Sequence, residues 1–410
     1  FIHEGLGQFE KLHKYLNAQG LAHSWFLCSA SAYAQHKDTV PNVVPFHVPK
    51  ENPKSYFYTK NIETRTQRSF YLKQAIGDLL KKTGLDLIVA HGSGGFPLQL
   101  FDEFDIPIIS YIEFPSFGAH GHDKKYPQPE YSRYVDKLFE MSSYHQVIKS
   151  ELVIVPSAYA KTMYPSMLQE NIIPQMEGFD IVPKPSKFKK EPDCFYVGYT
   201  ARDLSSAKGF EQFILIAKQI LSRTQKKVRF VFCGAPKVLY SYEEVFLNQQ
   251  YPEAERPASF MHYILQREGI DLSSNSAFQH VSFSAYDDFA SFIDGMDMFL
   301  YPLQYGSANW GIFEIVFRGK IVIGSDRCFL PEVIESGRNG LLCPYDDIDY
   351  WTHCALKIID APLEYAYLGR NALRDANERF HISRVAPRYL DIFESAIAKR
   401  KLRRLNCSKR

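Results

Sequence analysis

Hydrophobic positions along the chain follow two alternating spacings. Continuous apolar runs such as LDLIVAH (85–91) and KVRFVFCG (227–234) are typical of buried strands, whereas QFEKLHKYLNAQG (8–20) and GFEQFILIAKQILSR (209–223) repeat at helical spacing. A helix follows a strand over most of the length. Because such alternation produces parallel sheets covered by helices, the pattern predicts an α/β protein with doubly wound parallel sheets.

The remaining segments extend the same pattern. Further strands are expected at FIH, HSWFLCSA, IPIISYIEF, ELVIVPS, CFYVGYT, FQHVSFS, MDMFLYP and KIVIGS, and further helices at RSFYLKQAIGDLLKKTG, FPLQLFDEF (96–104), YVDKLFEMSSYHQVIKS, DDFASFIDGM and GIFEIVFRG. The alternation stops at IVPKPSKFKKEPD (181–193), which is rich in lysine and proline and is typical of a linker. A chain of 410 residues exceeds what one core usually supports. We expect two Rossmann-like domains, over 1–182 and 183–385, followed by a helix and a basic tail over 386–410.

Composition narrows the class of protein. The chain is 45% hydrophobic and 23% charged, with no apolar run near the roughly 18 residues of a membrane helix. A net charge of +2 does not indicate a nucleic-acid partner. Seven cysteines form no C-x-x-C pair, which favours a reducing cytoplasm, and because the chain opens on a strand without a charged and apolar leader, we expect no signal peptide. The basic tail KRKLRRLNCSKR could touch anionic lipid at the inner membrane face or could simply be solvated.

The strongest candidate for chemistry is the stretch from Tyr301 to Leu342, which runs strand, glycine-bearing loop, helix, strand. Gly306 to Gly311 would place backbone N–H groups at a helix N-terminus, where anionic or hydroxyl-rich ligands bind, with Glu314 one turn into the helix. The alternative is an ordinary buried helix in which Glu314 offsets the helix dipole.

A second candidate is VGYTARDLSSAKGF (197–210), in which a strand runs into a loop with Arg202 and Lys208. Two cations beside a helix start suit a pyrophosphate, because arginine offers a planar fork and lysine a compact charge. A solvated loop would show the same residues.

Together these segments resemble the donor signature of glycosyltransferase family 4, whose members are retaining enzymes of the GT-B fold. Arg202 and Lys208 match the family's diphosphate-binding pair, and Glu314 matches the second of two donor-site glutamates eight residues apart. Gly306 stands where the first glutamate is usual. Three further segments resemble one branch of the same family, so the resemblance spans nearly the whole chain. They are the opening FIHEGLGQF (1–9), the loop HGSGG (91–95) and the strand end YIEF (111–114).

The resemblance implies the following site residues. Its catalytic residues are Glu113, Arg202 and Lys208; its donor-binding residues are Gly5, Gly7, Arg202, Lys208, Gly234, Ser284, Ser307, Ala308, Asn309, Trp310 and Glu314; its acceptor-binding residues are His91, Glu113 and His120. Glu113 could orient the donor sugar or accept the acceptor's hydroxyl proton, or it could cap a turn.

Two motifs invite a metal interpretation, HGHD (120–123) and DDID (346–349). The family's chemistry needs no metal, a polar glycine-interrupted loop explains the first motif, and the second follows a structural loop. We therefore expect no metal and no cofactor besides the nucleotide sugar.

The sequence thus predicts a retaining, metal-independent glycosyltransferase that moves a sugar from a nucleotide diphosphate sugar, with UDP favoured, to a glycan or lipid-linked acceptor in a cleft between two domains. A non-catalytic nucleotide-sugar or glycan-binding protein and a GT-B nucleotide-sugar epimerase are the alternatives. A dinucleotide oxidoreductase is disfavoured, because no G-x-G-x-x-G follows an early strand.

Overall fold

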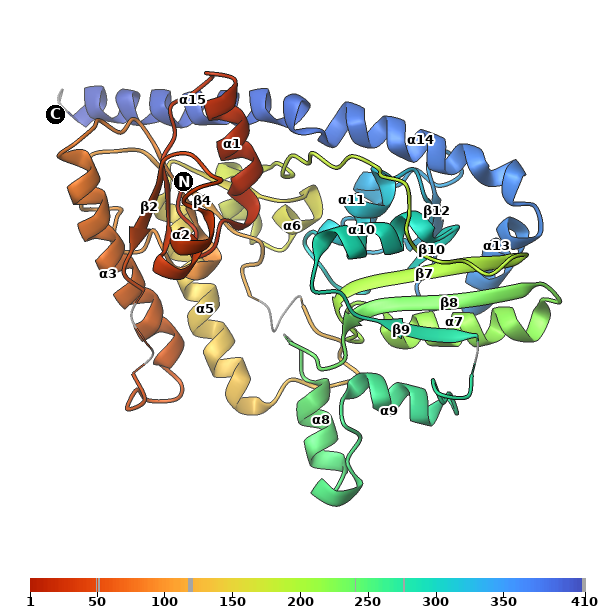
Figure 1. Ribbon diagram of the computed structural model, residues 1–410. Coiled ribbons are helices and arrows are strands. Elements are labelled where there is room, and N and C mark those ends of the chain that lie inside the picture. Colours follow the sequence, from red (N-terminus) through yellow and green to blue (C-terminus); the bar gives the residue numbers. More distant parts are fainter. Residues whose placement is uncertain (49, 51, 117–120, 240, 276, 408–410) are drawn as a thin grey trace. The chain divides into compact units, whose positions relative to one another are not determined.

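The chain forms two compact units, and neither is one continuous stretch. The computed structural model describes residues 1–48, 50, 52–116, 121–239, 241–275 and 277–407 (Figure 1). Unit 1 consists of Phe1–Phe117, Glu130–Asp180 and Arg379–Arg410, and unit 2 of Gly118–Pro129 and Ile181–Glu378. The chain therefore passes between the units four times, and two of these crossings lie near the predicted boundaries 182/183 and 385/386.

Unit 1 is built on parallel strands. The order β3-β4-β5-β6 joins β3 (Ile88–His91), β4 (Ile108–Tyr111), β5 (Leu152–Val155) and β6 (Ile172–Pro174), and β1 (Phe26–Ser29) pairs with β2 (Val43–Phe46). Ile2 bridges both groups, because it pairs with Leu27 on one side and with Ala90 on the other. The strand predicted at FIH (1–3) is therefore reduced to the single bridging residue Ile2. Strands β3 and β4 are buried along their whole length, as expected for a parallel sheet covered on both faces.

Helices cover this sheet. They are α1 (Glu10–Ala18), α2 (Ala30–His36), α3 (Lys60–Leu80), α5 (Glu130–Lys149), α6 (Ala158–Thr162) and α15 (Ile382–Cys407). Helix α15 packs against α1 (Figure 1). Tyr389 and Phe393 of α15 share a core with Phe9, Leu12 and Leu16.

The basic tail belongs to this packing. Arg400 and Arg404 pair with Asp105, at 3.0 and 2.6 Å, and Arg403 pairs with the buried Glu151 at 2.9 Å. Much of the tail's charge therefore holds α15 in place. No helix within the described residues has an apolar run long enough to span a bilayer.

The helix predicted over 96–104 is wrong. These residues form separate turns, in which Leu98, Leu100 and Glu103 each donate to the carbonyl three residues earlier. Phe96 and Leu100 are both buried in the core beneath α3. The helical spacing of the apolar residues therefore arises from a series of turns that buries the same side chains.

Unit 2 contains a six-stranded parallel sheet of order β12-β11-β10-β7-β8-β9. Its strands are β7 (Cys194–Asp203), β8 (Lys227–Ala235), β9 (Phe278–Val281), β10 (Met298–Tyr301), β11 (Ile321–Ser325) and β12 (Leu341–Cys343). The order of the strands reverses between β7 and β10. In open α/β sheets, ligands bind beyond the carboxyl ends of the strands at such a reversal.

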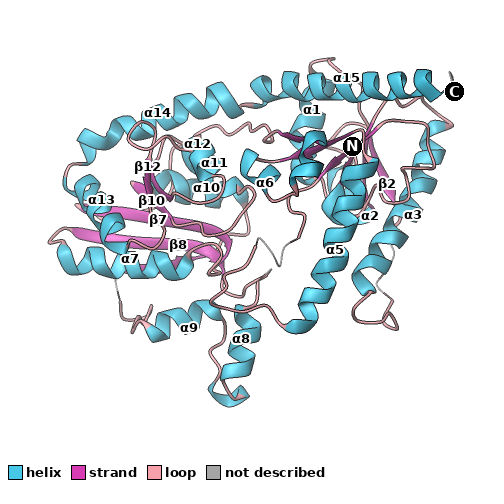
Figure 2. Cartoon of the chain, turned by 180° about the vertical axis from the view of Figure 1, so that it is seen from behind, coloured by secondary structure: helices cyan, strands magenta, loops and turns pink. Residues whose placement is uncertain are grey.

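The helices of unit 2 lie around this sheet (Figure 2). They are α7 (Phe210–Arg223), α8 (Glu243–Gln250), α9 (Phe260–Arg267), α10 (Tyr286–Gly295), α11 (Trp310–Val316), α12 (Leu330–Val333), α13 (Ile348–Asp360) and α14 (Pro362–Phe380). Helices α7 and α13 pack side by side, and Trp351 of α13 is fully buried. The predicted linker over 181–193 contains no helix or strand.

One short segment, 121–129, enters unit 2 from between two stretches of unit 1. Its Tyr126 is 2% exposed and packs edge-on against Phe246 and Phe260, with ring centroids 5.2 and 5.0 Å away. The Tyr126 hydroxyl donates to Glu211 Oε2 at 3.1 Å. Burial opposes ionisation of Glu211, but Lys125 and Arg267 outweigh it and lower the pKa of this carboxyl. We call residues 121–129 the Tyr126 segment.

Candidate active site

Two loops meet at the carboxyl ends of β7 and β10. Gln304 and Tyr305 both donate their backbone N–H groups to the carbonyl of Ala207, at 3.1 and 3.0 Å. Gly209 has a φ of 81°, and a Cβ at this position would lie 1.6 Å from the carbonyl oxygen of Pro302. Only glycine permits so close an approach with left-handed backbone. The two loops are therefore held together as one element at the reversal of the sheet.

The end of β7 and the loop that follows it carry the two predicted diphosphate-binding cations. Arg202, expected on the loop, is exposed near the end of β7, and Lys208 is half-buried on the loop itself. The carbonyl of Lys208 accepts the hydroxyl of the buried Tyr199 at 3.0 Å, and the N–H of Ser206 donates to the buried Glu243 at 2.8 Å. Burial raises the pKa of Glu243. Main-chain and side-chain contacts thus fix the path of the loop that carries Lys208.

The second loop contains the predicted backbone donors. Ser307 is 2% exposed, Ala308 is half-buried and Trp310 is 44% exposed. The side chain of Asn309 accepts the N–H of Gly311 at 3.1 Å and so caps the N-terminus of α11. Asparagine at this position sets where the loop ends and the helix begins.

Glu314 has partners that sequence reasoning missed. It accepts the hydroxyl of Tyr286 at 2.9 Å and pairs with Arg318 at 3.3 Å, and Arg318 also pairs with Asp294 at 2.8 Å. The Arg318 side chain is 1% exposed, so two carboxylates compensate a buried cation. Burial and Glu314 raise the pKa of Tyr286 to about 12. The i, i+4 spacing of Glu314 and Arg318 on one helix could have predicted their ion pair from the sequence.

Other predicted donor-site residues lie at different strand ends. Gly234, at the end of β8, accepts a hydrogen bond from the ring of His280 through its carbonyl, at 2.9 Å. Ser284 is exposed and precedes α10. Gly306 is buried, and a Cβ there would lie 3.4 Å from Leu303 and 3.8 Å from the carbonyl oxygen of Ala308. These are ordinary contacts, so the backbone tolerates a Cβ at the position of the missing glutamate.

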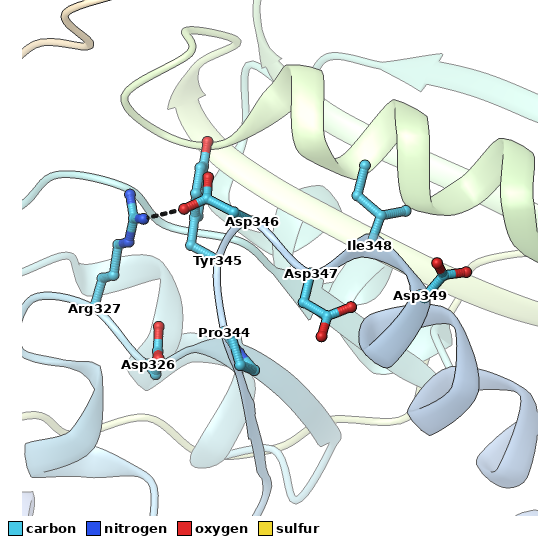
Figure 3. Close-up of a pocket in the computed structure, with 8 residues that line it drawn as sticks. All are labelled: Asp326, Arg327, Pro344, Tyr345, Asp346, Asp347, Ile348 and Asp349. Atoms are coloured by element: carbon cyan, nitrogen blue, oxygen red, sulfur yellow. Dashed lines mark hydrogen bonds and ion pairs between the residues drawn. The ribbon is translucent and has the colours of Figure 1, made fainter.

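A cavity of about 630 Å³ lies at the carboxyl ends of β11 and β12 (Figure 3). Its lining residues are Asp326, Arg327, Pro344, Tyr345, Asp346, Asp347, Ile348 and Asp349. The second motif that invited a metal interpretation, DDID (346–349), has protein partners. Asp346 pairs with Arg327 at 2.5 Å, Asp347 caps α13, and Asp349 pairs with Arg223 at 2.5 Å. Within the described residues no group of three or more metal-binding side chains is found.

In unit 1, the first glycine turn meets the end of β4. Gly7 has a φ of 47°, and its Cβ would lie 2.7 Å from the ring of His3, whose Nδ1 contacts the carbonyl of Gly5 at 3.0 Å. Next to this turn, Gln8 donates to Glu113 at 2.5 Å. The structure thus brings three predicted residues, Gly5, Gly7 and Glu113, to one region.

His91 lies beside this group at the end of β3. It is 8% exposed, its ring lies 4.5 Å from that of His3, and it stacks on Tyr111 at 5.7 Å. Burial, aided by His3 and Arg65, holds the pKa of His91 well below its ordinary value, so the ring is neutral at pH 7. His120, the third predicted acceptor residue, lies outside the described residues.

Comparison with known proteins identifies the family. The model described as Glycosyl transferase family 4 group matches residues 21–183, and the model described as Glycosyl transferases group 1 matches residues 180–375. No match was found among curated protein sequences.

Solved structures show the same fold. Sucrose-phosphate synthase of Thermosynechococcus elongatus is 17% identical, with a TM-score of 0.68 over 95% of this chain and 92% of its own. HepE of Anabaena, solved in complex with UDP-glucose, is 16% identical, with a TM-score of 0.61 over 96% and 98%.

TarM is 15% identical, with a TM-score of 0.55 over 78% of this chain, which spans 58% of TarM's length. These similarities confirm the predicted GT-B fold. With family models matching from residue 21 to residue 375, the chain belongs to the glycosyltransferases of the family 4 type.

Proposed function

We propose that this glycosyltransferase is a retaining, metal-independent enzyme that moves a sugar from a nucleotide diphosphate sugar, with UDP favoured, to a glycan or lipid-linked acceptor. The observation that carries the proposal is the locked pair of loops at the reversal of the unit 2 sheet. Two hydrogen bonds to Ala207 and the close approach of Gly209 to Pro302 hold Lys208 and the 306–311 loop in one fixed element.

Each loop contributes a different part of the chemistry. Arg202 and Lys208 offset the negative charge that builds on the departing diphosphate as the glycosidic bond lengthens. Backbone donors of residues 307–310 supply hydrogen bonds to the same group. Because side-chain cations balance the charge, no step requires a divalent ion. Glu314, held by Arg318 and Tyr286, keeps acceptor positions for ribose hydroxyls.

Glu113 is the proposed catalytic carboxylate of unit 1. It is half-buried and follows β4, and Gln8 orients it through a hydrogen bond of 2.5 Å. A carboxylate held in this way can accept the proton of the acceptor hydroxyl or orient the donor sugar. His91, neutral and next to the same turn, supplies a hydrogen-bonding ring to the acceptor.

Structural relatives support the choice of donor. HepE was solved with UDP-glucose, with UDP, and with UDP and glucose, and a TarM variant from S. aureus was solved with Fondaparinux, alpha-GlcNAc-glycerol and UDP. At identities of 15 to 16% these complexes bear on this chain only through the shared fold.

A second function, nucleotide-sugar binding without turnover, is favoured by one observation. The position of the family's first donor-site glutamate is occupied by Gly306, which brings no carboxylate to the sugar. The epimerase alternative lacks such support, because epimerisation needs paired acid and base groups next to the sugar.

The decisive experiment measures ligand-induced thermal stabilisation and then turnover. We expect UDP or UDP-sugars to raise the melting temperature of the full chain, because they bind the folded state. Lys208→Ala should abolish the shift, whereas Lys189→Ala, an exposed lysine of the linker, should retain it. GDP, ADP and NAD serve as competing ligands.

The outcome separates the candidates. Donor hydrolysis or transfer by the unaltered chain, with the anomeric configuration of the product retained and the rate unchanged by EDTA, supports the enzyme. Stabilisation without turnover supports the binder. Absence of a shift with every nucleotide, or a shift with NAD alone, refutes both.

A further inference from the structure

The 91–95 loop of unit 1 rests on a buried arginine that the proposed mechanism does not use. Arg65 of α3 is 6% exposed, and its guanidinium lies 3.8 Å from the ring centroid of Phe139. Nη2 donates to the carbonyl of Ser93 at 2.6 Å, and Nε donates to Asn61 at 3.1 Å. The guanidinium therefore lies directly against the main chain of the glycine loop.

Buried polar atoms at this place lack a hydrogen-bond partner within the described residues. They include Nη1 of Arg65 and Nε2 of His91, on side chains that are both more than nine-tenths buried, and Oε1 of Gln146 beside Gly92. The two side chains are near enough for Arg65 to lower the pKa of His91. Buried donors are rarely left unpaired, because desolvating them is unfavourable.

The charge of Arg65 is also uncompensated. Within the described residues no carboxylate lies within ion-pair distance of it, and the nearby Arg68 pairs with Glu4 at 3.3 Å. Burial and then Arg68 lower the pKa of Arg65 to about 10, so it remains protonated at pH 7. Arg318 is equally buried but has two carboxylate partners. A buried cation without a counter-ion points to an anion supplied from outside the chain.

The loop itself suits a close approach by such a group. Gly95 has a φ of 74°, and its Cβ would lie 2.7 Å from that of Arg65. A Cβ at Gly92 would lie 2.5 Å from the Gln146 side chain. Side chains are therefore excluded from these two positions, while Ser93 is half-exposed between them.

We infer that the acceptor bound by unit 1 carries an anionic group, a phosphate or a carboxylate, that lies on the 91–95 loop and is neutralised by Arg65. This inference rests on the proposed function, because it names the chemical class of that enzyme's acceptor. Ser93 supplies a hydroxyl to the same anion, and Arg65 acts as a binding residue rather than a catalytic one. A planar guanidinium suits phosphate and carboxylate alike.

Inorganic phosphate is the first probe, and the Lys208→Ala chain is the protein to use. That substitution removes one of the two unit 2 cations expected to bind phosphate and leaves Arg202, so the affinity lost on Arg65→Gln, and not the phosphate binding that remains, reports on unit 1. We expect phosphate to stabilise Lys208→Ala and to lose about thirtyfold or more in affinity when Arg65→Gln is added, because truncating one partner of a buried charge pair has effects of this size. Arg133→Gln, an exposed arginine of α5, is the matched control and should leave phosphate binding unchanged.

A second variant keeps the test decisive if Arg65→Gln fails to fold. Ser93→Asp would add a carboxylate to the residue whose carbonyl the guanidinium contacts, and we expect it to raise the melting temperature and to abolish phosphate binding. Glucose 6-phosphate, glucuronate and glucose then distinguish the class of anion. Stabilisation by the first or the second, but not by glucose, supports the inference and names the group.

Three outcomes overturn the inference: no phosphate effect in Lys208→Ala, an equal loss in Arg133→Gln, or equal binding of glucose. The proposed function is tested separately through UDP. A folded Arg65→Gln chain should still be stabilised by UDP, so loss of phosphate binding alone cannot be mistaken for failure of the donor site.

Discussion

Replacement of Gly209 by alanine should separate the two loops of the proposed donor site. The new Cβ would lie 1.6 Å from the Pro302 carbonyl oxygen, so the main chain must move by more than 1 Å to reach an ordinary contact. Left-handed backbone at alanine costs about 1–2 kcal/mol. Loss of the two hydrogen bonds to Ala207 adds about 1 kcal/mol each, so we expect destabilisation of about 3–4 kcal/mol.

Gly269→Ala provides the matched control. Gly269 has a φ of 68°, but nothing lies within 4 Å of its Cβ position, so this variant shows the backbone cost alone, about 1–2 kcal/mol. Urea unfolding and UDP titration of both variants are the assays. UDP affinity should fall at least about tenfold in Gly209→Ala, which corresponds to about 1.4 kcal/mol. Equal unfolding free energies in the two variants, or unchanged UDP affinity in Gly209→Ala, would refute the reasoning.

Other predictions concern separate features. Tyr126→Phe removes one hydrogen bond to Glu211 and should destabilise unit 2 by about 1 kcal/mol in urea unfolding. Tyr126→Ala also leaves a cavity and should destabilise it by about 3–5 kcal/mol. Similar values for both variants would show that the ring is not packed. Burial lowers the pKa of His13 from 6.5 to about 4. Between these pH values the unfolded chain therefore binds a proton at His13 and the folded chain does not. The free energy of unfolding should fall by about 3 kcal/mol as the pH is lowered from 6.5 to 4. A His13→Asn chain with the same pH dependence would contradict this. Gly306→Glu should fold, since its Cβ would make only ordinary contacts, with Leu303 and the carbonyl of Ala308, and it should raise donor turnover about tenfold through one charge-assisted hydrogen bond to the sugar. Lower turnover with intact UDP binding would show that this enzyme orients the sugar differently.

Most of the fold could be predicted because local patterns determine it. The apolar runs that become β3, β4, β7, β8 and β10 are buried strands, and the helical spacing of 209–223 becomes α7. The failure at 96–104 has a physical cause, since Phe96 and Leu100 reach the same core whether a helix or a series of turns carries them.

The site was predictable only where residues are close in sequence. Arg202 and Lys208 stand in one motif, and their role at the diphosphate stays a prediction, whereas the partners of Glu314 include Tyr286, which lies 28 residues away on another helix. The buried position of Arg65 without a counter-ion could not be predicted either, because α3 meets the 91–95 loop only after folding. Spacing along the chain does not encode such contacts.

The Tyr126 segment limits how this enzyme can be dissected. A gene fragment that encodes residues 181–378 contains every strand of unit 2 but lacks the ring that fills the space between Phe246 and Phe260. An isolated donor domain, or a chimera that exchanges it between relatives, would begin with an apolar hole and with Glu211 deprived of two of its partners. Modular swapping in this protein therefore requires two pieces of coding sequence, and residues 121–129 must travel with the domain they complete.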